Sequence, residues 1–200
     1  MISEADVVVI GSGGLGAATA FYLAKRGDKN VALLDKHEIG LQTSPRAAGM
    51  VSCVRKGDLM ISLIKLACER IRSFSKDTGQ PLNWVHSGSL KIARRPQDAE
   101  VIASDVARGR RMGLEVEQIS PEEAHRLNPF LQSAGIHAAM RVGDDIYFDP
   151  TQVAVGFGHG AEANGARLMP RTAVTCVKIE SREGNRCRDR PGINSRADRR

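Results

Sequence analysis

A run of glycines near the start of the chain has the residue types and spacing to hold a phosphate group. Residues 11–16 read Gly-Ser-Gly-Gly-Leu-Gly, a G-x-G-x-x-G pattern. Gly11 permits a tight turn, Gly13 removes the side chain where a pyrophosphate would approach the backbone, and Gly16 allows close packing. Free N–H groups at the start of a following helix attract the anion. We therefore assign a dinucleotide cradle to Gly11, Ser12, Gly13, Gly14, Leu15 and Gly16.

The segments around these glycines make the pattern more specific. Residues 6–10 are apolar after the first, which predicts a strand buried on both faces of a parallel sheet. Gly14–Arg26 is rich in alanine and leucine and predicts a helix that ends at Gly27. Val31–Leu34 predicts a second buried strand. Strand, glycine turn, helix and strand together indicate a βαβ unit.

An acidic residue stands at the end of the second predicted strand. A carboxylate at Asp35 would accept hydrogen bonds from the ribose of an adenosine and would repel a 2′-phosphate, which disfavours NADP. The neighbouring Lys36 is included in the candidate site. The alternative for Asp35 is a solvated carboxylate at a strand end. The glycine pattern serves NAD and FAD equally, so these residues leave both cofactors open.

The rest of the chain alternates helical and strand-like segments without internal repeats. A long helix is predicted from about residue 58 until residues 78–81 stop it, and Ser120 begins a capping box for a short helix. For Asp149, capping of a helix that begins near Pro150 is favoured over a catalytic role. The other predicted helices span residues 96–112 and 151–164, and the predicted strands span residues 83–85, 89–93, 115–119, 136–140 and 174–180.

Composition limits the classes of partner. The net charge is +6, but residues 181–200 hold seven arginines against three acids, which accounts for +4 of it. With aromatic residues at 4%, the chain offers no stacking platform, so we expect no nucleic-acid partner. We expect no membrane partner and a cytoplasmic location, because the first residues lack a signal-peptide pattern and no apolar stretch is long enough to span. The four cysteines lack metal-ligand spacing and predict neither a metal site nor a structural disulfide.

The last residues differ in composition from the others. Residues 184–200 contain one aliphatic side chain, Ile193, and no periodicity, which predicts disorder. One interpretation is a solvated basic tail. The other is a frameshift, because codons chosen for residues 186–200 and shifted by one base can encode a strand-like continuation. We therefore hold open that the chain is truncated or frameshifted after about residue 185.

Five segments resemble a known family. They are VVVIGSGGLGAATAFYLAKRG, VALLDK, TSPRAAGMV, GSLKIA and DDIYFDPTQVA. The chain up to about residue 180 resembles the FAD-dependent oxidoreductases of the D-amino acid oxidase superfamily, which include sarcosine oxidase, glycine oxidase and dimethylglycine dehydrogenase. The resemblance implies FAD and an α/β fold in which a Rossmann-like FAD-binding domain carries part of an α+β substrate domain. The implied ranges are 1–80 and 149–180 for the FAD-binding domain, 81–148 for the partial substrate domain, and 181–200 for the disordered or frameshifted tail.

The same resemblance implies further cofactor contacts. In this family the segment after the second strand wraps over the pyrophosphate and flavin, and a returning strand places a backbone contact on the adenine at the position of Val174. Some relatives carry, near the position of Arg46, a histidine that bonds covalently to the flavin. Arginine cannot do so, and we therefore expect non-covalent FAD. The implied contacts in the wrapping segment are Thr43, Ser44, Arg46, Ala48 and Gly49.

The reaction that the resemblance implies is oxidation of a carbon–nitrogen bond in a small or N-methylated amino acid, with hydride transfer to the flavin. Arg55 is the candidate for binding the substrate carboxylate, and a surface arginine is its alternative interpretation. Two other functions stay open. One is an FAD-dependent oxidoreductase acting on a 2-hydroxy acid. The other is an inactive dinucleotide-binding fragment, or a subunit whose partner supplies the missing C-terminal half, because members of the family are usually far longer.

Overall fold

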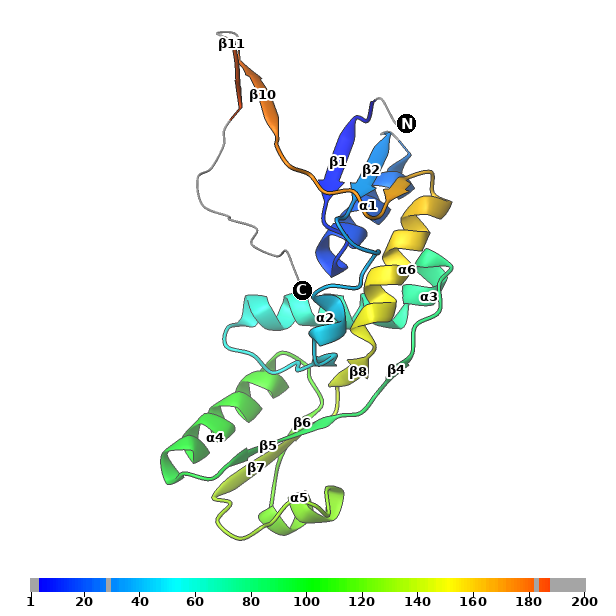
Figure 1. The fold of residues 1–200 in the computed structure, drawn as a ribbon. Coiled ribbons are helices and arrows are strands. Elements are labelled where there is room, and N and C mark those ends of the chain that lie inside the picture. Colours follow the sequence, from blue (N-terminus) through cyan, green and yellow to red (C-terminus); the bar gives the residue numbers. More distant parts are fainter. Residues whose placement is uncertain (1–3, 28–29, 182–183, 188–200) are drawn as a thin grey trace, which may run out of the picture.

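The computed structural model describes residues 4–27, 30–181 and 184–187, and the side chains of those up to residue 177. The helices are α1 (Gly14–Arg26), α2 (Asp58–Arg72), α3 (Phe74–Thr78), α4 (Pro96–Arg111), α5 (Pro121–Leu127) and α6 (Pro150–Ala163), with a 3-10 turn η1 (Ser44–Arg46). The strands are β1 (Val7–Ile10), β2 (Val31–Leu34), β3 (Met50–Val51), β4 (Trp84–Val85), β5 (Ser89–Ala93), β6 (Val116–Ile119), β7 (Ala138–Val142), β8 (Ile146–Phe148), β9 (Arg167–Met169), β10 (Lys178–Ser181) and β11 (Gly184–Cys187). Two units result, seen at the top and bottom of Figure 1.

The first unit is a parallel sheet with strand order β1-β2-β9. Helices α1 and α6 pack together beside it (Figure 1). Their contact is close because small side chains alternate with aromatic ones: Gly160 of α6 lies against Phe21 of α1, whose ring centroid is 5.4 Å from that of Phe157. The predicted βαβ segment is therefore confirmed, and Gly27 ends α1 with a left-handed φ of 75°.

Burial of β1 on both faces was a wrong prediction. Val8 and Ile10 are 52% and 57% exposed, whereas Val31 to Leu33 of β2 are buried. The strand lies at the edge of its sheet, and α1 and α6 cover only one face. Alternate side chains of β1 therefore point away from the helices, and no other described residue covers them.

The second unit is an antiparallel sheet with strand order β5-β7-β6. Its central strand β7 is covered on both faces, because Met140 packs with Ile102 of α4 while Ala139 packs with Ala124 of α5. Helix α2 contributes Ile61 to the same core as Met140. The buried face of α2 thus belongs to the core of this second unit, although α2 lies within the range 1–80 assigned to the first domain.

A short sheet, β3-β8-β4, lies between the two units. Beside it the fully buried carboxylate of Asp145 accepts hydrogen bonds from the backbone N–H of Cys53 at 2.6 Å and from the Ser89 hydroxyl at 2.5 Å. These bonds join the chain after β3 to the start of β5. The buried carboxylate of Asp145 therefore ties together three segments that contribute to the core of the second unit.

The bounds of several helices and strands differ from the predicted ones. The long helix is two helices, α2 and α3, separated at Ser73. The strand predicted at residues 136–140 runs from Ala138 to Val142, and the one predicted at 174–180 begins only at Lys178. Strands β3, β8 and β9, each of two or three residues, were not predicted, although the equally short β4 was.

Two further predictions concern the end of the chain. Residues 184–187, inside the predicted tail, form β11 and pair with β10, while residues 182–183 and 188–200 lie outside the described residues. The frameshift hypothesis therefore stays a hypothesis. The expectation of no structural disulfide was wrong, because Cys176 is disulfide-bonded. Wide spacing in sequence does not determine which cysteines meet in space.

Candidate functional site

The glycine turn, residues 11–16, joins β1 to α1 in a conformation that requires glycine. Gly11 has a φ of 95°, and a Cβ at Gly16 would lie 1.8 Å from the carbonyl oxygen of Gly11. Gly13 is the N-cap of α1, and neither a capping side chain nor an acid occupies the first turn of the helix. The N–H groups at the start of α1 are thus left for an anion.

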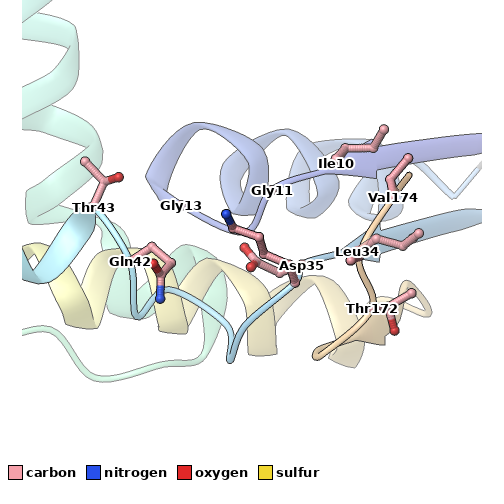
Figure 2. Close-up of a pocket in the computed structure, with 11 residues that line it drawn as sticks. Ile10, Gly11, Gly13, Leu34, Asp35, Gln42, Thr43, Thr172 and Val174 are labelled. Carbon is pink, nitrogen blue, oxygen red and sulfur yellow. The ribbon is translucent and has the colours of Figure 1, made fainter. Parts of the chain in front are cut away.

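A cavity of about 330 Å³ lies between this turn, the end of β2 and the segment that follows β9 (Figure 2). Six of the predicted site residues line it: Gly11, Gly13, Asp35, Lys36, Thr43 and Val174. Sequence reasoning missed five others that line it: Ile10, Leu34, Gln42, Thr172 and Ala173. Each of the five is within two residues of a predicted one, so proximity in sequence was the available signal.

Backbone hydrogen bonds bring the segment 172–174 to the cavity. The N–H of Thr172 donates to the carbonyl oxygen of Asp35 at 2.7 Å, and the N–H of Asp35 donates to that of Met169 at 3.1 Å. These bonds continue the parallel pairing of β2 with β9 by a few residues. Val174 therefore reaches the same cavity as the glycine turn although it lies 158 positions after Gly16.

Asp35 is a buried carboxylate held by three hydrogen bonds. Its Oδ2 accepts from the N–H of Ser12 at 2.7 Å and from the Ser12 hydroxyl at 2.6 Å, while Oδ1 accepts from the N–H of His37 at 2.8 Å. Burial raises the pKa of Asp35, but the bonds from Ser12 and His37 outweigh it, so the pKa lies below its ordinary value of 3.8. The site therefore keeps a negative charge at neutral pH.

Ser12 does not line the cavity. Its side chain is fully buried, and its hydroxyl accepts from the N–H of Gly40 at 3.1 Å while donating to Asp35. Gly14, Gly16 and the 90% exposed Leu15 also do not line the cavity. Within the predicted cradle, Gly11 and Gly13 are therefore the residues that the structure brings to it.

The segment predicted to contact the flavin is largely exposed. Thr43 lines the cavity, whereas Ser44 and Arg46 form η1 and the Arg46 guanidinium donates to the carbonyl oxygen of Gln42. Ala48 is exposed. Gly49 is buried with a φ of 78°, and a Cβ there would lie 2.2 Å from the carbonyl oxygen of Phe148. A glycine is thus required at position 49, because any larger residue would collide with the backbone of β8.

Arg55 and Asp149 have different roles. Arg55 is exposed, follows the buried Cys53 and Val54, and does not line the cavity. Asp149 caps α6, as predicted, because its Oδ1 accepts from the N–H of Thr151 at 2.8 Å. The carboxylate of Asp149 is therefore structural.

Comparison with known proteins decides the family. The sequence pattern of the family described as FAD dependent oxidoreductase matches residues 6–198. This chain belongs to that family. It is 28% identical over 180 residues to the mitochondrial sarcosine dehydrogenase of Mus musculus, which covers 90% of this chain and 20% of that protein. It is 28% identical over 185 residues to the glycine oxidase of Bacillus licheniformis, covering 88% of this chain and 48% of that protein.

The fold agrees with this assignment. The crystal structure of glycine oxidase from Geobacillus kaustophilus matches with a TM-score of 0.79 and 25% identity, over 92% of this chain and 50% of that one. The expected family, the α/β fold and FAD as the cofactor of the family are confirmed. The chain spans about half the length of the glycine oxidases and a fifth of the mitochondrial dehydrogenase. No helix among the described residues combines the length and apolarity needed to cross a membrane.

Proposed function

We propose that this chain is the FAD-binding portion of an oxidoreductase that oxidises the carbon–nitrogen bond of a small or N-methylated amino acid. The observation that carries the proposal is the cavity in which the glycine turn, the ionised Asp35 and Val174 meet. Bound FAD would supply the acceptor for the hydride. The residues present fit a dinucleotide, because a Cβ at Gly13 would meet only the Ser44 hydroxyl, at 3.9 Å, and backbone can be approached closely there.

Each part of the cavity suits one part of the cofactor. The start of α1 offers unpaired N–H groups and no acidic side chain to the pyrophosphate. Asp35 offers a carboxylate to the adenosine ribose, and the backbone at Val174 lies where the adenine would follow. The remaining cofactor contacts that we propose are Ser12, Gly14, Leu15, Gly16, Lys36, Thr43, Ser44, Arg46, Ala48 and Gly49.

The attachment of FAD and the substrate class are parts of the same proposal. An arginine at position 46 has no ring nitrogen to bond to a flavin, which favours non-covalent FAD. The names of the relatives, sarcosine dehydrogenase and glycine oxidase, favour a small amino acid. Arg55 stays the candidate for the substrate carboxylate, because it is exposed and its backbone follows the buried residues Cys53 and Val54.

The uncovered face of β1 favours a second candidate function. Val8 and Ile10 expose apolar side chains on a sheet whose other face packs against α1 and α6. Exposed apolar sheet faces are sites of association. On this proposal the chain is a cofactor-binding subunit, and a partner polypeptide supplies the strands that complete the sheet.

The test is a visible absorption spectrum of the untagged 200-residue chain, purified after expression with riboflavin. Oxidised-flavin bands, and release of FAD by acid precipitation, are expected. Gly13→Glu should abolish the bands because it places a carboxylate at the start of α1. Thr19→Ala, on the same helix but outside the proposed contacts, should keep them.

Three results would separate the alternatives. A folded, colourless chain would contradict FAD binding. A coloured chain that glycine or sarcosine bleaches under anaerobic conditions supports the oxidoreductase. A coloured chain that no amino acid bleaches, and that is purified in a stable complex with a second polypeptide, supports the proposal of a cofactor-binding subunit.

A further inference from the structure

Ser12 is the one residue of the glycine turn with a polar side chain, and that side chain is enclosed. It is fully buried, and its Oγ lies 2.6 Å from Oδ2 of Asp35 and 3.1 Å from the N–H nitrogen of Gly40. A serine hydroxyl has one hydrogen. Because the N–H of Gly40 occupies an acceptor site of the hydroxyl, its hydrogen is directed to the carboxylate. Ser12 thus links the glycine turn, the end of β2 and the loop after β2.

The acceptor sites of Asp35 can be counted from these bonds. An ionised carboxylate has about four lone-pair sites, two on each oxygen. Oδ2 uses both, for the N–H and the hydroxyl of Ser12, and Oδ1 uses one for the N–H of His37. A single acceptor site therefore remains, on Oδ1. Because Asp35 lines the cavity, this site is available to a ligand there (Figure 2).

We propose that Ser12 is a positioning residue that fixes the Asp35 carboxylate and leaves it one acceptor site, so that Asp35 binds one of the two ribose hydroxyls of the adenosine. The proposal rests on the proposed FAD-binding function. Two hydroxyl donors meet one acceptor site, so the second hydroxyl must find another partner or water. A glycine or alanine at position 12 would keep the backbone N–H bonds to Asp35 but leave Oδ2 with an unused acceptor site, so that the carboxylate would offer an open site on each oxygen.

The unmodified chain gives the first test. ADP, 2′-deoxy-ADP and 3′-deoxy-ADP are titrated into the 200-residue chain by calorimetry. One deoxy compound should bind at least about 10-fold more weakly than ADP, because a hydrogen bond to a charged group is lost, and the other within about twofold. Equal losses for both compounds, or no loss for either, would overturn the single-site proposal.

Variants then test the role of Ser12. Ser12→Ala should weaken ADP binding by about 10-fold and narrow the difference between the two deoxy compounds. Asp35 then keeps only the N–H bonds from residue 12 and His37 and loses the hydroxyl that fixes which acceptor site is open. In the Asp35→Asn background the same change should have no further effect on ADP affinity. Losses of ADP affinity that add up in the double variant would overturn the positioning role of Ser12. An unchanged preference between the two deoxy compounds in Ser12→Ala would overturn it as well. A role of Ser12 in stability alone would not change that preference.

The matched control is Thr19→Ala, which removes a hydroxyl that donates to the carbonyl oxygen of Leu15 on α1 and should leave all three affinities unchanged. Circular dichroism establishes that each variant is folded, and Ser12→Cys, whose thiol is a weaker hydrogen-bond donor than the hydroxyl, replaces an unfolded Ser12→Ala. The two proposals fail differently. A folded chain that binds neither ADP nor FAD contradicts the proposed function, whereas binding without the preference contradicts only the role of Ser12.

Discussion

The two main sheets of this molecule are covered to different extents. In the antiparallel sheet, β7 places Met140 and Ala139 on opposite faces, and both are at most 1% exposed because α4 and α5 lie on the two sides. In the parallel sheet, α1 and α6 cover one face, and Val8 on the other is 52% exposed. The second unit therefore completes its core within the described chain, and the unit that carries the cavity does not.

The polar groups of the two units differ in the same way. In the second unit charged groups bind one another: Asp105 pairs with Lys91 and Arg108, and Arg141 pairs with Glu115 and Glu117. In the first unit the start of α1 has no side-chain partner, and Asp35 keeps an open acceptor site. Among the described residues, the candidate chemistry therefore lies where the start of α1 and the carboxylate of Asp35 keep open hydrogen-bonding sites.

The largest expected effect is at the glycine turn. Gly16→Val should lower the free energy of unfolding by at least about 4 kcal/mol or prevent folding, because the contact is with backbone that cannot yield. Gly14→Ala, on the same turn but with open space around it, should be neutral or stabilising. Urea unfolding followed by circular dichroism measures both. Equal losses of the free energy of unfolding in the two variants would mean that β1 and α1 do not approach each other as closely as the structure shows.

The second prediction contrasts the two sheets directly. Met140→Ala should lower the free energy of unfolding by about 3 kcal/mol, because the residue is 1% exposed in a packed core. Val8→Thr should change it by less than about 0.5 kcal/mol and reduce self-association, since the side chain is half exposed. Urea unfolding and light scattering are the measurements. A large loss for Val8→Thr would show that something covers β1 in solution.

Helix caps supply a smaller contrast. Asp149 caps α6 of the first unit with bonds to two backbone N–H groups, and Ser120 caps α5 of the second with a bond to Glu123. Replacing either with alanine should cost about 1 kcal/mol of stability, with Asp149→Ala the larger because its cap is charged. Asp149→Asn should retain most of the stability. The reverse order would indicate that α6 contributes little to the fold of the first unit.

The smallest expected effect is confined to acid pH. The pKa of Asp35 is lower in the folded chain than its ordinary value of 3.8, so its stabilising contribution is complete above that value. It is lost as the pH falls below 3.8 towards the folded pKa. The stability difference between the unmodified chain and Asp35→Asn should therefore shrink between about pH 5 and about pH 3. A constant difference over this range would contradict the ionised, hydrogen-bonded Asp35.

The sequence alone determined the features that depend on neighbours in the chain. The glycine turn, α1 and its end at Gly27, and the caps Ser120 and Asp149 were predictable, because each is fixed by a side chain or glycine acting on backbone a few residues away. Asp35 at the end of β2 followed from the βαβ pattern. The resemblance, rather than any pattern in the residues, supplied Val174 and the segment at residues 43–49.

The tertiary structure decided which of these residues meet. The pairing of β2 with β9 brings Thr172 and Val174 to the cavity, and the bonds among Ser12, Asp35 and Gly40 turn the serine away from it. It also decided that β1 has one exposed face, although its sequence is that of a doubly buried strand. Local propensity cannot determine such outcomes, because they depend on which distant segments of the chain pack against a surface.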